Sequence, residues 1–126
     1  MKKIISLTVV TMGLAARVWA ATGVAEIRGT MMHSPIAGTV QLEETAGGLK
    51  VSAALVNIPA GQHGFHIHEF GNCADTGKAA GSHYNPMSAP HGQILKDGAQ
   101  HAHAGDLGNI TAGADGKATL EAVIPG

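Results

Sequence analysis

Residues 48–56 read GLKVSAALV, and apolar side chains occupy every second position of this stretch. Successive side chains of an extended chain point to opposite faces, so positions 49, 51, 53 and 55 share one face. Lys50 and Ser52 fall on the other face. A period of two is typical of a strand that is buried on one side. The stretch therefore predicts a half-buried β-strand.

Short segments of the same kind lie on both sides of this strand. We predict further strands at 24–30, 39–45, 63–70, 107–110 and 118–124, joined mostly by turns that contain Gly or Pro. The sequence shows no internal repeat, no heptad pattern and no helix longer than about a turn. The 126 residues hold one small domain. We expect an antiparallel all-β sandwich or barrel.

The composition narrows the classes of function. Charged residues make up 13% of the chain and hydrophobic residues 44%, which argues against disorder driven by charge. The formal net charge is -1, so the chain lacks the basic excess that a nucleic-acid partner requires. We therefore expect no nucleic-acid binding.

Residues 1–20 have the layout of a cleavable secretory signal. Lys2 and Lys3 precede an uncharged, mostly apolar run at 4–16, and Ala20 precedes the expected cleavage site. This run is shorter than the roughly 20 residues that a membrane-spanning helix needs. We expect no stable membrane anchor, with a retained anchor as the alternative. Arg17 leaves the cleavage position open, and the predicted exported domain covers 21–126.

The eight histidines are concentrated in one region, and seven of them lie between residues 63 and 103. On the predicted strand at 63–70, His66 and His68 point the same way and His63 points the other way. His66 and His68 can therefore share a metal, and imidazole suits copper or zinc. The alternative is an ordinary polar face of a strand.

A second set of candidate ligands follows in a stretch without periodicity, at 71–105. Loops of this length in a small domain are usually functional or disordered. His83, His91, His103 and Asp106 supply three imidazoles and a carboxylate, enough for a tetrahedral zinc site. The alternative is a His-rich tract that buffers metal loosely.

These motifs together resemble the copper/zinc superoxide dismutases, of the exported bacterial type. The resemblance rests on GFHIHEFGNC at 64–73, AGSHYNP at 80–86, His91-Gly92, and HAGDLGN at 103–109. It covers residues 24–124 in order and spacing. It implies a Greek-key β-barrel of eight strands, of which the last two are missing here.

The resemblance also implies a role for each candidate residue. His66, His68 and His83 correspond to copper ligands and form the catalytic set, and His83 would be shared with zinc. The remaining zinc ligands would be His91, His103 and Asp106, and His63 would be the structural histidine beneath the copper. Cys73 would be one half of an intrachain disulfide whose partner is absent from this chain.

The activity that the resemblance implies is the dismutation of superoxide. Copper would take an electron from one superoxide to give dioxygen, and return it with two protons to a second superoxide to give hydrogen peroxide. Zinc does not change its redox state and would act through position and charge. The signal-like segment leads us to expect export into the periplasm, with secretion beyond it as the alternative, and the resemblance allows a monomer or a homodimer.

The end of the sequence departs from the family pattern. The chain stops at residue 126, after the predicted sixth strand, and no His, Cys or Arg follows Asp106. The fourth copper histidine and the active-site arginine of the family are therefore absent. We interpret the chain as a fragment or a truncated product. The alternative function is a non-catalytic periplasmic copper/zinc-binding protein, or an inactive fragment.

Three residues have no fixed role at this stage. His33 lies beside Met31 and Met32 and is expected to be a plain surface residue, although thioether sulfur also suits cuprous ion. His101 is a solvated histidine or a reserve zinc ligand. Cys73, alone in an exported chain, would pair outside this chain or stay reactive, with a small buried residue as the alternative.

Overall fold

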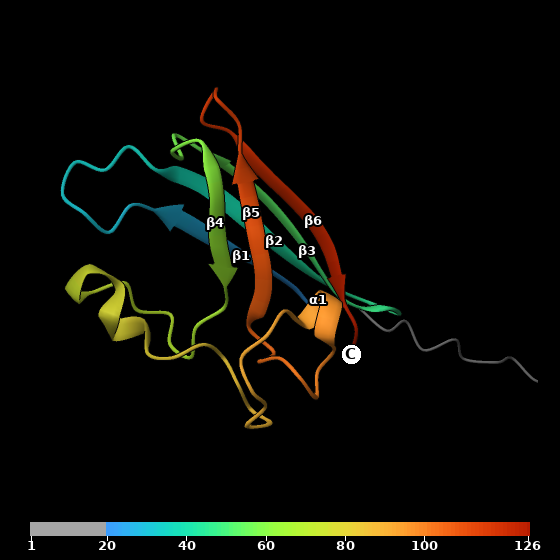
Figure 1. Ribbon diagram of the computed structural model, residues 1–126. Helices are drawn as coiled ribbons and strands as arrows, with labels where there is room; N and C mark the ends of the chain where they lie inside the picture. The colour runs from blue at the N-terminus through green and yellow to red at the C-terminus, as the bar shows by residue number, and fades with distance from the viewer. Residues whose placement is uncertain (1–19) are drawn as a thin grey trace, which may run out of the picture.

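A computed structural model describes residues 20–126, and the predicted signal segment lies outside the described residues except for Ala20. The described chain forms a six-stranded antiparallel sheet (Figure 1). Its strands are β1 (Thr22–Arg28), β2 (Ala37–Thr45), β3 (Gly48–Val56), β4 (Gly61–His66), β5 (Asp106–Ala112) and β6 (Ala118–Ile124). The all-β prediction is therefore confirmed, and the quoted stretch 48–56 is strand β3.

The strands lie in the order β1-β2-β3-β6-β5-β4, so the connection from β3 to β4 passes over two strands. The sheet curls, and residues of β1, β2, β3, β4 and β5 line one partly open pocket of about 190 Å³. In Figure 1 the long connection between β4 and β5 folds below the end of β4 and the start of β5. The topology therefore collects the His-rich connection at one end of the sheet.

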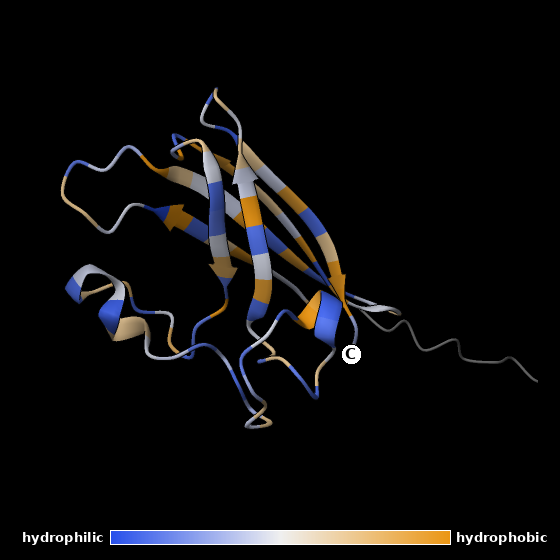
Figure 2. Cartoon of the chain, viewed as in Figure 1, coloured by the Kyte–Doolittle hydropathy of each residue, from blue (hydrophilic) through white to orange (hydrophobic). Residues whose placement is uncertain are grey.

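The core follows the period of two that the sequence predicts. Val51, Ala53 and Leu55 on β3 are buried, with Val51 fully so, because these positions face the inside of the curled sheet. Figure 2 shows the alternation of hydrophobic and hydrophilic residues along the strands. The buried cluster consists of Val40, Val51, Ala53, Leu55, Ile58, Ile94, Ala102, Leu107, Ile110, Ala112, Ala118 and Ile124.

The prediction for the fourth strand was wrong at its end. Strand β4 stops at His66 instead of residue 70, and its pairing with β5 shifts register between Gly64 and His66. Beyond this point the Ile67 N–H donates to the carbonyl of Gly105, and His68 forms an isolated bridge with His83. The chain leaves the ladder because the His-rich connection supplies new backbone partners. The period-two argument that paired His66 with His68 therefore does not apply.

The stretch at 71–105 is irregular as predicted, apart from two short helices. A 3-10 helix covers Asp75–Ala80, and α1 covers Ile94–Asp97. Ile94 at the start of α1 is buried and joins the core, which ties this part of the connection to the sheet. Within residues 20–126, no helix has the length and apolar character needed to cross a membrane.

Candidate metal centre

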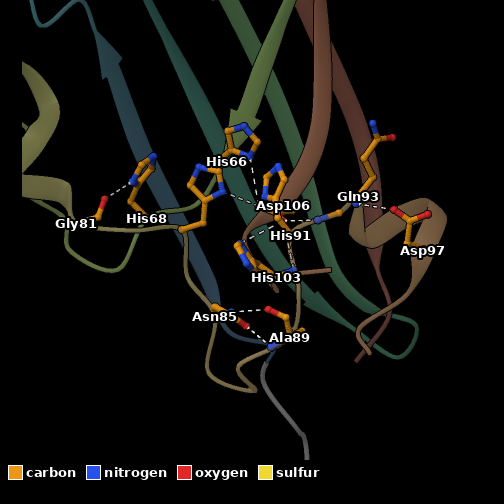
Figure 3. Close-up of polar contacts among 12 residues, drawn as sticks. His66, His68, Gly81, Asn85, Ala89, His91, Gln93, Asp97, His103 and Asp106 are labelled. Carbon is orange, nitrogen blue, oxygen red and sulfur yellow. Dashed lines mark hydrogen bonds and ion pairs between the residues drawn. The ribbon is translucent and has the colours of Figure 1, made fainter. Parts of the chain in front are cut away.

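The candidate ligands meet where β4 ends and β5 begins (Figure 3). His66 is the last residue of β4, and Asp106 is the first residue of β5. His83, His91 and His103 come from the connection between these strands. One ligand atom from each of His83, His91, His103 and Asp106 lies within 4.8 Å of the others. The structure thus brings together the four residues that the sequence predicts as zinc ligands.

Asp106 lies at the centre of this group, and its side chain is fully buried. Its Oδ1 lies 2.6 Å from Nδ1 of His83, and its Oδ2 lies 2.9 Å from Nδ1 of His91. The backbone N–H of Gly92 donates to Oδ2 at 3.0 Å, and that of His103 donates at 3.3 Å. A buried carboxylate needs such donors, because burial removes its hydrogen bonds to water.

These contacts keep Asp106 ionised. Burial alone would raise the pKa of the carboxyl group, because it disfavours the charged form. The hydrogen bond from Gly92, the hydrogen bond with His83 and the charges of nearby imidazoles outweigh burial and lower the pKa from 3.8 to about 2. Asp106 is therefore a permanent anion at neutral pH, as a metal ligand must be.

The donor set fits a zinc ion. Nδ1 of His103 is buried and has no hydrogen-bond partner, because its 3.3 Å approach to Asp106 lacks hydrogen-bond geometry. An unpaired buried nitrogen is costly unless something coordinates it. Three imidazole nitrogens and one carboxylate oxygen in mutual reach match the tetrahedral N and O ligation that zinc takes in proteins.

His66 and His68 contact the predicted zinc-ligand cluster through the ring of His83. The ring of His66 stacks on that of His83, with centroids 4.0 Å apart, and the ring of His68 meets it edge-on at 5.1 Å. Burial, and then the neighbouring His83, lower the pKa of His66. Its Nδ1 is also buried without a hydrogen-bond partner. His66 is therefore held neutral, the form that coordinates metal.

Comparison with known proteins shows the family of this chain. The family model described as copper/zinc superoxide dismutase matches residues 36–125. The chain belongs to the copper/zinc superoxide dismutase family. Copper and zinc are accordingly its cofactors, in agreement with the His and Asp cluster.

Two relatives in this superoxide dismutase family show how far the similarity extends. The chain is 35% identical over 94 residues to the extracellular superoxide dismutase [Cu-Zn] of Brugia pahangi, covering 72% of this chain and 46% of that protein. It is 44% identical over 70 residues to the putative superoxide dismutase [Cu-Zn] of Autographa californica nuclear polyhedrosis virus, covering 56% of this chain and 44% of that protein. The chain thus spans about half the length of the curated relatives it matches.

Other predicted residues lie outside the cluster. Nε2 of His63 is 2.7 Å from the carbonyl oxygen of Pro59. His63 does not belong to the cluster of His83, His91, His103 and Asp106. His33 and His101 are exposed. Cys73 is also exposed, so its interpretation as a small buried residue was wrong. The disulfide predicted for Cys73 stays a prediction.

Three contributors to the site were missed by the sequence analysis. The backbone of Gly92 binds Asp106, and Oδ2 of Asp97 accepts the neighbouring N–H of Gln93 at 2.8 Å. Asn85 closes the turn after His83 by two hydrogen bonds with Ala89.

Proposed function

We propose that this chain carries the bimetallic centre of a superoxide dismutase. His83, His91, His103 and Asp106 would hold zinc, and His66, His68 and His83 would hold copper. The observation that carries the proposal is the position of His83, whose ring contacts both His66 and His68 while its Nδ1 faces Asp106. Nε2, on the other side of that ring, is then available to the second metal.

Bound copper would supply the one-electron cycling by which two superoxide anions and two protons give dioxygen and hydrogen peroxide. The chain's own residues supply position and protons. The fully buried Asp106 orients the imidazole of His83 and fixes which nitrogen faces the zinc side. Nε2 of His83 is the atom placed to take up a proton and give it back. His66 contributes a neutral imidazole, because burial lowers its pKa.

We also infer that the protein is exported, into the periplasm. The support is the signal-like segment at 1–20 and a relative from Brugia pahangi that is named extracellular. Residues 21–126 would then form the dismutase domain, acting as a monomer or a homodimer.

The test is superoxide decay measured with the purified chain in three states: metal-free, loaded with zinc alone, and loaded with both metals. We expect acceleration only with both metals. The matched variants are His66→Ala, expected to keep zinc and lose acceleration, and His101→Ala, an exposed histidine outside the cluster, expected to change neither. Binding of both metals without any acceleration would contradict the proposal and favour a metal-binding protein without turnover.

A further inference from the structure

Three backbone hydrogen bonds form a closed ring beside the metal centre. The N–H of Ile67 donates to the carbonyl of Gly105 at 2.9 Å, and the N–H of Gly105 donates to the carbonyl of Tyr84 at 2.9 Å. The N–H of Tyr84 donates back to the carbonyl of Ile67 at 2.8 Å. Each residue therefore gives one hydrogen bond and accepts one, and the ring joins three segments that are far apart in the sequence.

Each member of the ring is a direct neighbour of candidate metal ligands. Ile67 lies between His66 and His68, Tyr84 follows His83, and Gly105 precedes Asp106. Consecutive Cα atoms are about 3.8 Å apart, so fixing the ring fixes where these ligand side chains start. The ring thus links His66 and His68 of the copper set, the shared His83 and the zinc carboxylate of Asp106 without using any of their side chains.

The pairing around the ring strengthens this link. His68 and His83 are opposite each other in an isolated antiparallel bridge, and the N–H of Glu69 donates to the carbonyl of Ser82 at 3.0 Å. The carbonyl of Gly105 also accepts the N–H of Leu107 at 3.1 Å, at the start of β5. The ring is therefore anchored to the sheet on one side and to the His68–His83 bridge on the other.

Only glycine fits at position 105. A Cβ atom there would lie 2.3 Å from the carbonyl oxygen of Ile67 and 3.0 Å from the backbone nitrogen of Tyr84. Both atoms belong to the ring itself, so neither can rotate aside as a side chain would. Gly105 is also buried, which leaves no room for it to move outward. A side chain at this position would push the ring open.

We propose that Gly105 is a positioning residue of the metal centre, because the absence of its side chain permits the Ile67–Tyr84–Gly105 ring that sets the copper ligands against the zinc ligands. The inference rests on the proposed metal sites. Residues that orient metal ligands typically change affinity by about 10- to 100-fold when they are altered. We expect Gly105→Ala to weaken zinc binding by a factor in that range, although no ligand is changed.

The experiment compares Gly105→Ala with Gly71→Ala in the full chain. Gly71 lies in the same connection between β4 and β5, and a Cβ there would meet no atom within 4 Å. Zinc affinity is measured by competition with a chelator, and the visible spectrum of cobalt(II) in the zinc site reports the ligand geometry. We expect Gly71→Ala to match the unchanged chain and Gly105→Ala to lose affinity and alter the cobalt spectrum. Equal zinc affinity and the same cobalt spectrum in both variants would overturn the proposal.

A second variant decides the question if Gly105→Ala does not fold. Replacing the backbone amide of Tyr84 by an ester removes one N–H donor of the ring and leaves every side chain in place. We expect weaker zinc binding and a changed cobalt spectrum here too, and an unchanged affinity would overturn the proposal. If the unchanged chain itself binds no zinc, the proposed metal centre fails. If it binds zinc and the ring variants bind equally well, only the role of Gly105 fails.

Discussion

Replacing Asp106 by asparagine removes the charge at the centre of the site and nearly preserves its shape. The environment lowers the pKa of this buried carboxyl group from 3.8 to about 2. At about 1.4 kcal/mol per pKa unit, the ionised form contributes about 2 kcal/mol to folding of the metal-free chain. We therefore expect Asp106→Asn to lower the free energy of unfolding at pH 7 by about 2 kcal/mol, since it loses that contribution.

The sign of the pH dependence makes this prediction specific. A carboxyl group whose pKa is lowered in the folded chain stabilises the fold at pH values above its pKa in the unfolded chain. This stabilisation is lost as the pH falls from about 4 towards about 2. The assay is urea unfolding of the metal-free chain, followed by far-ultraviolet circular dichroism across this range. The free energies of unfolding of the two proteins should converge as Asp106 of the unchanged chain becomes protonated. A stability difference that stays constant from pH 7 to pH 2 would refute the reasoning.

Three further predictions concern the metals and the core. His83→Ala should weaken binding of both metals while His91→Ala chiefly weakens zinc binding, as measured by elemental analysis; the same pattern of copper and zinc loss in the two variants would contradict a shared His83. Zinc affinity should be lower at pH 5 than at pH 7, because metal ligands must be deprotonated to bind, and a flat chelator titration over this range would contradict this. Val51→Ala should lower the free energy of unfolding by about 2 kcal/mol and Val24→Ala by almost nothing, because Val51 is fully buried and Val24 is 70% exposed; similar urea midpoints would count against this core.

The strands could be predicted because their signal is local. The alternation at 48–56 places Val51 and Leu55 on the buried face whatever the partners of the strand are. The end of β4 could not be predicted in this way. It depends on a register shift near Gly64 and on a hydrogen bond from Ile67 to Gly105, which lies far along the chain. Pattern arguments contain no information about such distant partners.

The same distinction between local and distant information applies to the candidate site. The residue types at His83, His91, His103 and Asp106 indicate a metal from their spacing and chemistry alone. Their convergence on one buried carboxylate, with a backbone donor from Gly92, is a property of the folded connection. Gly105 likewise resembles an ordinary loop glycine in the sequence, and only the backbone around it shows why a side chain has no space there.

The account depends most on His83 joining two different metal sites, with zinc held by the Asp106 group. The most direct measurement is the metal content of the full chain after reconstitution with zinc and copper, passage through a desalting column and elemental analysis. The account predicts one zinc and one copper retained per chain. Retention of neither ion by the folded chain would contradict it.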